Sequence, residues 1–264
     1  QIVARLSLCG AFGVTAAYTP RRDLVSKVRR RLTQHHAAQP ARLSFAEPVL
    51  SITFDDFPAS AAEAGARVLE RHGARGTYYA AAGMAGVEGP CGLGYSADDI
   101  ARLVAAGHEI GCHTSSHADC ARRDIFSTLE DLARNRDALM RMGAPAPSTH
   151  AFPYGETSAE LKNNLPPRFM SARGILPGLN VGASDLAQLR AYPLFGAGGM
   201  QRVSRALKLA AKRKAWVIGF THDVADTPSA WGTRADDLDA LLQEAHRLGF
   251  VILPVTAALS RRLT

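Results

Sequence analysis

Short apolar runs alternate along the chain with segments whose apolar residues recur every three or four positions. Runs rich in β-branched or aromatic residues and stopped by Gly, Pro or Asp predict buried strands. A three- or four-residue apolar spacing predicts amphipathic helices. We expect strands over 49–54, 76–80, 108–112, 150–154, 215–221 and 250–254. We expect helices over 60–72, 96–106, 125–142, 201–214 and 235–248.

This order of elements predicts the fold class. Strands that alternate with helices favour a parallel sheet, and six or seven such units in residues 48–264 suit a distorted (β/α) barrel better than an open doubly wound sheet. In both architectures the site lies at the carboxyl ends of the strands. Residues 163–194 are harder to interpret, because four prolines interrupt them and only 169–172 has an extended pattern.

Charge divides the chain into two parts. Residues 1–47 hold eight Lys or Arg against two acidic residues, which is +6 of the total +7. We therefore treat 1–47 as a basic N-terminal arm and 48–264 as the main domain. Such a run is more often a solvated helix face than a binding surface. We expect no nucleic-acid partner, and we rank contact of the arm with a membrane or an anionic polymer below the solvated face.

Composition leaves the compartment open. No apolar run approaches the length needed to cross a bilayer. Residues 6–18 are mildly apolar, like the core of a signal peptide, but lack a clear basic start. Because the chain begins at Gln1, the cell envelope stays open beside the slightly favoured cytoplasm. The four cysteines show no CxxC pair and leave one or two disulfides open; they are Cys9, Cys91, Cys112 and Cys120.

Polar clusters follow four of the expected strands. Asp55 and Asp56 end the first strand, and two adjacent carboxylates repel each other unless a cation or a histidine lies beside them. A second interpretation is that they cap a helix beginning near Ala59. The other clusters are His113 to His117, Tyr154, and His222 with Asp223.

Two of these histidines are suited to bind a metal. His113 and His117 are four residues apart, so a helical turn there would project both imidazoles from one face. With a strand-end carboxylate they form a two-histidine, one-carboxylate set, which leaves positions open for water and substrate. A structural zinc site of Cys112, His117 and Cys120 is less favoured. Cys112 and His113 are adjacent, so in an extended strand they point to opposite faces.

Four segments, in this order, resemble the signature of the polysaccharide deacetylases, the NodB-homology domain of carbohydrate esterase family 4. The segments are Thr53–Pro58, Gly107–His117, Phe152–Gly155 and Phe220–Asp223. The similarity spans about Pro48 to Leu259 and excludes the arm. It implies a distorted (β/α) barrel of about seven strands and a divalent metal ion, usually zinc.

The resemblance also implies roles for individual residues. Asp55 would be the general base and His222 the general acid, and the Tyr154 backbone N–H would stabilise the oxyanion. The implied metal ligands are Asp56, His113 and His117. The implied activity is hydrolysis of acetyl groups from N-acetylated amino sugars of a poly- or oligosaccharide. O-acetyl esterase activity, hydrolysis of a non-sugar amide, and a non-catalytic carbohydrate-binding role remain alternatives.

The chain departs from the family pattern at two positions. Phe57 replaces a glycine, and Ala151 stands where an arginine commonly pairs with the base. We therefore expect the Phe57 ring to narrow the cleft. We also expect the acidic limb of the pH–rate profile to lie at higher pH than an arginine-paired base would give. We place Phe57, Pro153 and Trp231 among the substrate-binding residues. Asp185 would either tune His222 or begin a helix.

Overall fold

The protein is described by a computed structural model that covers residues 23–263. Cys9 and the apolar segment 6–18 lie outside these residues. The strands are β1 (Pro40–Leu43), β2 (Val49–Asp55), β3 (Thr77–Ala80), β4 (Glu88–Gly89), β5 (Gly92–Leu93), β6 (Glu109–Cys112), β7 (Thr149–Ala151), β8 (Ser171–Arg173), β9 (Gly182–Asp185), β10 (Tyr192–Pro193), β11 (Trp216–Thr221) and β12 (Val251–Ile252). The α-helices are α1 (Leu24–His35), α2 (Ala66–Arg71), α3 (Ala97–Ala105), α4 (Ile125–Arg141), α5 (Ala159–Asn164), α6 (Gly199–Arg213), α7 (Ala235–Arg247) and α8 (Val255–Ser260).

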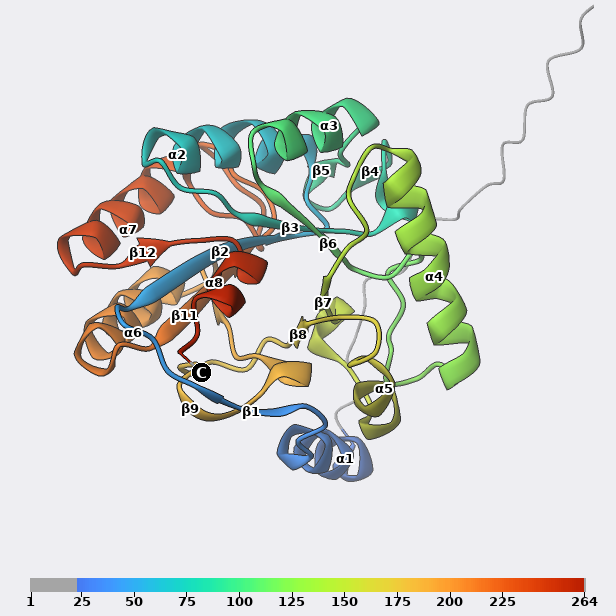
Figure 1. The fold of residues 1–264 in the computed structure, drawn as a ribbon. Helices are drawn as coiled ribbons and strands as arrows, with labels where there is room; N and C mark the ends of the chain where they lie inside the picture. Colours follow the sequence, from blue (N-terminus) through green and yellow to red (C-terminus); the bar gives the residue numbers. More distant parts are fainter. Residues whose placement is uncertain (1–22, 264) are drawn as a thin grey trace, which may run out of the picture.

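A curled parallel sheet forms the centre of the molecule. Seven strands follow the order β10-β11-β2-β3-β6-β7-β8, and β12 pairs with the beginning of β2. The helices α2, α3, α4, α6 and α7 lie on the outside of the curve (Figure 1). The expected α/β class and strand number are confirmed, and the curled sheet forms a half-barrel.

Residue alternation along the strands separates two apolar layers. In β2, Leu50, Ile52 and Phe54 pack in the cluster shared with the outer helices. Trp216 and Phe220 of β11 belong to a second cluster, on the inside of the curve. Since successive side chains point to opposite faces of a strand, Asp55 lies on the face opposite Phe54. A carboxylate thus stands at the end of a strand whose seven residues are all buried.

The strongly periodic segments fold as the sequence predicts. Each expected strand and each expected long helix is present, with ends that differ by a few residues. The helix after Ser96 begins with a capping box, in which Ser96 and Asp99 bond reciprocally. The helix expected over 60–72 instead starts with a π-helical turn, Ala61–Gly65, before α2. The pattern did not predict β10, α5 or the antiparallel pair of β1 and β9.

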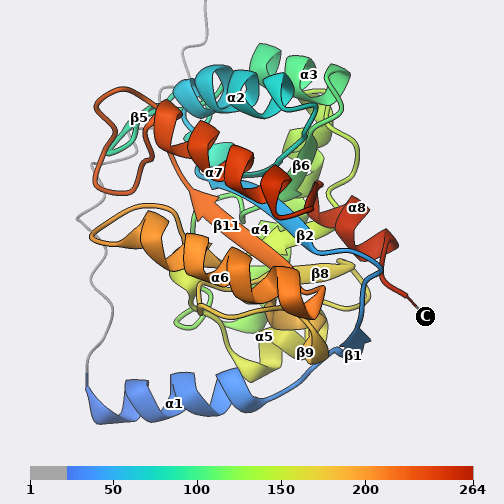
Figure 2. The same cartoon turned by 90° about the vertical axis from the view of Figure 1, so that its left-hand side faces the viewer.

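The described part of the basic arm packs on the main domain. Arg30 forms an ion pair with Glu156 at 2.6 Å, and β1 pairs with β9. The buried ammonium of Lys162 donates to the carbonyl oxygen of Thr33 at 3.0 Å and binds the Asp185 carboxylate at 2.8 Å. Figure 2 shows α1 along one side of the molecule, next to the strands β1 and β9.

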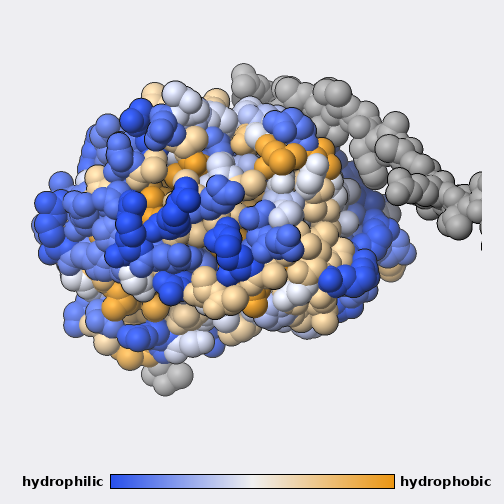
Figure 3. Space-filling view, turned by 90° about the horizontal axis from the view of Figure 1, so that it is seen from above, coloured by the Kyte–Doolittle hydropathy of each residue, from blue (hydrophilic) through white to orange (hydrophobic). Residues whose placement is uncertain are grey.

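The outer surface over α2 and α3 is mostly hydrophilic, with small scattered apolar groups (Figure 3). No helix in residues 23–263 has the length and apolar character needed to span a bilayer. The three described cysteines, Cys91, Cys112 and Cys120, are free thiols.

Candidate active site and metal centre

The backbone at the end of β2 points the side chains of Asp55 and Asp56 in different directions. Asp55 is the last residue of the strand, whereas Asp56 has φ of 49°, in the left-handed region. The turn directs the Asp56 carboxylate toward His113 and His117. Left-handed backbone costs a non-glycine residue about 1–3 kcal/mol and concentrates at functional sites. Of the five such residues between 23 and 263, four lie here: Asp56, Thr114, His117 and Tyr154.

The two histidines meet by a route that differs from the expected one. Residues 113–117 form a loop without helical structure, so the helical-turn expectation is wrong. Positive φ values at Thr114 (59°) and His117 (49°) fold the loop back on itself. The ring centroids of His113 and His117 lie 5.1 Å apart.

Asp56, His113 and His117 form one compact cluster. One ligand atom from each lies within 4.8 Å of the others. The Nε2 atom of His117 is 3.1 Å from Oδ2 of Asp56, and Nε2 of His113 is 3.4 Å from Oδ1. Burial alone would raise the pKa of Asp56, but the charges of His117 and His113 outweigh it and hold this pKa well below its usual range. Burial lowers the pKa of His113 to about 4.

The second ring nitrogen, Nδ1, of each imidazole also has a hydrogen-bond partner. Nδ1 of His113 donates to the Ala151 carbonyl oxygen at 2.8 Å, and Nδ1 of His117 lies 3.0 Å from the Tyr154 hydroxyl. These contacts leave both Nε2 atoms facing Asp56, which is how metal-binding histidines are usually oriented. Within the described residues, Oδ1 of Asp56 is buried and has no hydrogen-bond partner. The donor set therefore fits a divalent metal ion, whereas Cys112 and Cys120 lie in a separate apolar cluster.

The arginine missing at position 151 is supplied by another strand. Arg173, at the end of β8, is fully buried, and its guanidinium forms an ion pair with the Asp55 carboxylate. The ring faces of Tyr79 and Phe220 lie 5.1 and 5.0 Å from the guanidinium carbon. The expectation that Asp55 lacks an arginine partner is wrong, and with it the argument for a displaced acidic pH limb. Ala151 is itself fully buried.

The Phe57 ring belongs to the core. It is fully buried, stacks on Tyr95 at 4.3 Å between ring centroids and meets Tyr78 edge-on at 5.1 Å. The expectation that this ring narrows the cleft and binds substrate is therefore wrong. Sequence could not distinguish these cases, because the residue after a strand end can turn its side chain to either layer.

His222 is oriented by the loop that follows β11. Its backbone N–H and its Nδ1 atom both contact the Trp231 carbonyl oxygen at 3.2 Å. Because that oxygen only accepts hydrogen bonds, Nδ1 carries the proton and Nε2 is left for other contacts. The imidazole lies near enough to Asp56 to lower the pKa of that carboxyl, as one of the smaller causes.

Asp223 and Asp185 have structural roles. Asp223 accepts bonds from the Ser229 backbone N–H at 2.7 Å and from its hydroxyl at 2.5 Å, and thereby closes the loop that carries Trp231. Asp185 binds Lys162 and accepts from the Ala187 N–H, so it begins a short helical turn. The suggestion that Asp185 tunes His222 is wrong, and its helix-starting alternative is confirmed.

Tyr154 and Pro153 lie on the turn after β7. Pro153 is buried, and Tyr154 has φ of 60° with a half-exposed ring against His117, at 4.5 Å between centroids. Trp231 is 46% exposed. Tyr154 and Trp231 therefore both present aromatic surface to solvent, whereas Pro153 supports the turn from within.

Two residues of α4 that no sequence motif marked hold backbone next to the site, Asp131 in the histidine loop and Asn135 at the end of β3. The buried carboxylate of Asp131 accepts the backbone N–H groups of Ser115 (2.8 Å) and Ser116 (3.2 Å), between the two histidines. Asn135, one turn later, accepts from Ala82 N–H and donates to the Ala80 carbonyl oxygen, both at 2.8 Å. The available signal was an Asp and an Asn four residues apart on the apolar face of a helix.

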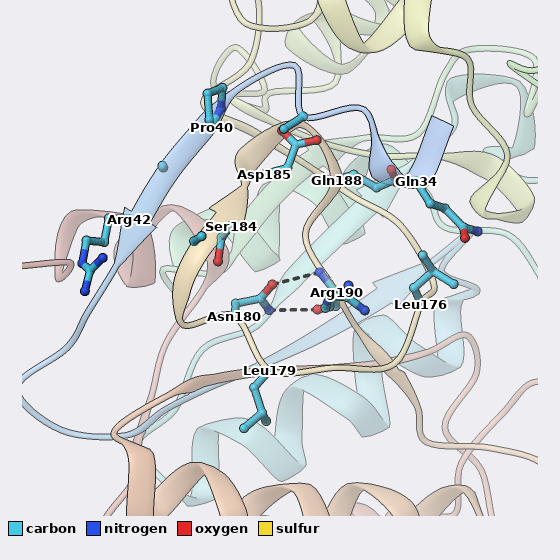
Figure 4. Close-up of a pocket in the computed structure, with 13 residues that line it drawn as sticks. Gln34, Pro40, Arg42, Leu176, Leu179, Asn180, Ser184, Asp185, Gln188 and Arg190 are labelled. Atoms are coloured by element: carbon cyan, nitrogen blue, oxygen red, sulfur yellow. Dashed lines mark hydrogen bonds between the residues drawn. The ribbon is translucent and has the colours of Figure 1, made fainter. Parts of the chain in front are cut away.

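A cavity of about 550 Å³ lies away from this cluster, between α1, β1 and residues 176–190. Figure 4 shows Asn180 bound at both ends to the backbone of Arg190 on its wall, with Asp185 nearby. Its lining contains no histidine, and Asp55, Asp56 and Arg173 are all absent from it. The geometry therefore favours the Asp56 cluster as the chemical centre.

Sequence comparison matches one family. The model of the family described as polysaccharide deacetylase matches residues 43–166, which include Asp55, both histidines and Tyr154. No curated protein matches the chain.

Several solved structures share the fold. A family 4 acetyl xylan esterase from Clostridium thermocellum, in complex with cobalt, is 20% identical with a TM-score of 0.59, over 80% of this chain and 90% of that one. The Bc1960 peptidoglycan N-acetylglucosamine deacetylase is 16% identical with a TM-score of 0.60, over 88% and 96%. A mutant of BA3943, described as a CE4 family pseudoenzyme with restored activity, is 12% identical with a TM-score of 0.57, over 83% and 71%. At these identities the likeness establishes the fold alone.

Proposed function

Since the chain belongs to the polysaccharide deacetylase family through residues 43–166, we propose that it is a metal-dependent hydrolase that removes acetyl groups from N-acetylated amino sugars of a poly- or oligosaccharide. The observation that carries this proposal is the Asp56, His113 and His117 cluster beside the Asp55–Arg173 pair. The cluster supplies a set of metal ligands, and the pair supplies a separate carboxylate, Asp55, that belongs to no ligand set and can serve as the base. Binding alone requires no such second carboxylate.

Asp56, His113 and His117 would hold the divalent ion, for which zinc is our first choice because imidazole and carboxylate are among its ordinary ligands. Bound there, the ion would supply Lewis-acid polarisation of the acetyl carbonyl and lower the pKa of water.

The remaining chemistry belongs to the protein's own groups. Asp55, oriented by Arg173, accepts a proton as the water oxygen forms a bond to the acetyl carbon. The Tyr154 N–H donates to the developing oxyanion, a contribution typically worth about 3 kcal/mol. His222 acts as the imidazolium: its Nδ1–H stays on the Trp231 carbonyl oxygen, and its second proton, on Nε2, passes to the amine nitrogen as the carbon–nitrogen bond breaks. The proton taken up by Asp55 returns to His222 through solvent after the products leave. The products are acetate and the free amino sugar.

Two observations weigh against a non-catalytic binding protein. That alternative rested on the residues at 57 and 151, but Phe57 packs in the core and Arg173 pairs with Asp55. Trp231 and Tyr154 supply exposed rings suited to contact a sugar, and we assign them, not Phe57, to substrate binding.

The test is an acetate-release screen with zinc-loaded protein on chitooligosaccharides, peptidoglycan fragments and acetylated xylan. We expect chelator-sensitive acetate release from an N-acetylated substrate. Release from acetylated xylan alone would assign O-acetyl esterase activity instead. No release from any of the three by folded, metal-loaded protein would contradict the proposal.

A further inference from the structure

Helix α1 is fixed to the domain by its inner face. The Arg29 guanidinium donates to the Ala121 carbonyl oxygen at 2.8 Å, and Arg30 pairs with Glu156 at 2.6 Å. Ala121 follows His117 by four residues, and Glu156 follows Tyr154 by two. The helix is therefore held beside the loops that carry the candidate site.

The outer face of α1 is apolar and uncovered by the described residues. Leu24, Val28 and Leu32 are 79%, 55% and 68% exposed. Their four-residue spacing places the three side chains in one stripe along the helix. Isolated exposed apolar residues are ordinary, but a continuous stripe on one helix marks an interaction surface.

The charges around the stripe indicate what covers it. The α1 sequence contains no acidic residue, and Arg31 and His35 are exposed beside the stripe. In the sequence, Arg21 and Arg22 stand just before the helix. A helix with an apolar stripe and a basic border has the composition of helices that lie in the interface of an anionic bilayer.

We propose that α1 is an interfacial helix, which inserts the stripe of Leu24, Val28 and Leu32 into the surface of an anionic lipid bilayer. A second copy of the chain fits this face less well, because two basic helices repel each other. Three side chains also supply much less than the roughly 800 Å² per partner that a stable interface needs. Nucleic acid would use the arginines and leave the stripe uncovered.

The contacts of Arg29 and Arg30 give this proposal a consequence for the site. A bilayer-bound α1 would hold the loops after His117 and Tyr154 near the lipid surface. If the proposed function is correct, the substrate is then a glycan close to a membrane. Vesicle binding requires no catalysis, so the docking proposal and the proposed function fail independently.

The test is co-sedimentation of the full chain with vesicles of phosphatidylglycerol and phosphatidylcholine in equal parts, and with vesicles of phosphatidylcholine alone. We expect binding to the mixed vesicles that is at least about tenfold tighter than to the neutral ones. Raised salt should weaken it. The combined variant Leu24→Gln, Val28→Gln, Leu32→Gln should reduce binding to mixed vesicles at least about tenfold. Glutamine preserves helix propensity, so α1 should still form.

The matched control carries the same number of apolar-to-Gln changes elsewhere. Phe126→Gln, Met140→Gln and Leu209→Gln alter exposed residues of α4 and α6, and this variant should bind mixed vesicles like the parent. Equal binding by the stripe variant and the parent would overturn the proposal. So would absence of binding by the parent, or a parent dimer that the stripe variant converts to a monomer.

Discussion

Asp55 and Asp56 are adjacent in sequence and face different partners. Asp55 pairs with the buried guanidinium of Arg173, and Asp56 contacts His113 and His117. The change in direction comes from the left-handed backbone at Asp56. One residue of strained turn therefore separates the carboxylate that we propose as the proton acceptor from the one that we propose as a metal ligand.

Replacing Arg173 tests its role as the partner of Asp55. Arg173→Met should lower kcat by about 10²-fold or more, since the base loses the group that orients it. It should also destabilise the fold by about 3–5 kcal/mol, because a buried carboxylate is left without its counter-ion. The ion content should be unchanged, since the guanidinium contacts none of the three ligands.

Lys162→Met is the matched control for that change. Lys162 is also fully buried and paired with an aspartate, Asp185, but it contacts no residue of the site. We expect similar destabilisation in denaturant titrations and near-parental kcat at a temperature where both variants are folded. A normal kcat in Arg173→Met would show that Asp55 needs no guanidinium partner.

The contrast between the motif residues and Arg173 explains how much of the site the sequence alone could predict. Asp55, Asp56, His113 and His117 lie in segments of recognisable order at the ends of strongly periodic strands. Arg173 ends a three-residue strand in a proline-interrupted region, and its partner is 118 positions away. Local pattern contains no information about such a pair. A strand-end arginine on the same rim as two carboxylates was the one available signal.

At the scale of elements, loops that follow the strands are held by single buried carboxylates. Asp131 of α4 fixes the loop between the two histidines, and Asp223 closes the loop that carries Trp231. The sequence predicted the helix that carries Asp131 and the strand that precedes Asp223. It did not predict the loop shapes, because positive φ at Thr114 and His117 is set by tertiary contacts and not by residue type.

The close approach at Gly232 tests the loop after β11. A methyl group there would lie 2.3 Å from Oδ1 of Asp223, so Gly232→Ala must displace the carboxylate that holds Ser229. Trp231 and the Nδ1 partner of His222 should move with it. We expect kcat to fall about 10- to 100-fold with the metal retained.

Gly89→Ala is the control for that loop. Gly89 lies on β4, and a methyl group there meets only the Gly92 carbonyl oxygen, at an ordinary 3.8 Å. This variant should keep the parent's kcat. If Gly232→Ala also kept it, the Asp223 loop would not position His222.

At the scale of the whole molecule, a buried histidine outside the site couples stability to pH. His150 on β7 packs between Phe152 and Phe169, and burial lowers its pKa from 6.5 to about 3. Below pH 6.5 the unfolded chain binds a proton that the folded chain does not. Stability is therefore fully present above pH 6.5 and falls as the pH drops toward 3.

Replacing this histidine should flatten the acid side of the stability profile. At about 1.4 kcal/mol per pH unit, His150 lowers the free energy of unfolding by roughly 2 kcal/mol between neutral pH and pH 5. Urea titrations in chelator give the free energy of unfolding at both pH values. Its drop from neutral pH to pH 5 should be smaller in His150→Leu than in the parent, by that amount. The exposed histidine variant His246→Leu should keep the parent's pH dependence. A parental slope in His150→Leu would place the acid sensitivity elsewhere.

The central claim is that Asp56 holds a metal ion while its neighbour Asp55 accepts the proton. Metal content and acetate release of Asp55→Asn and Asp56→Asn, measured side by side, test it most directly. We predict that Asp55→Asn keeps about one divalent ion per chain, as a one-ion site requires, and loses about 10²- to 10⁴-fold in rate. Asp56→Asn should lose both ion and activity. An Asp55→Asn protein that sheds its metal, beside an Asp56→Asn protein that keeps it, would contradict the account.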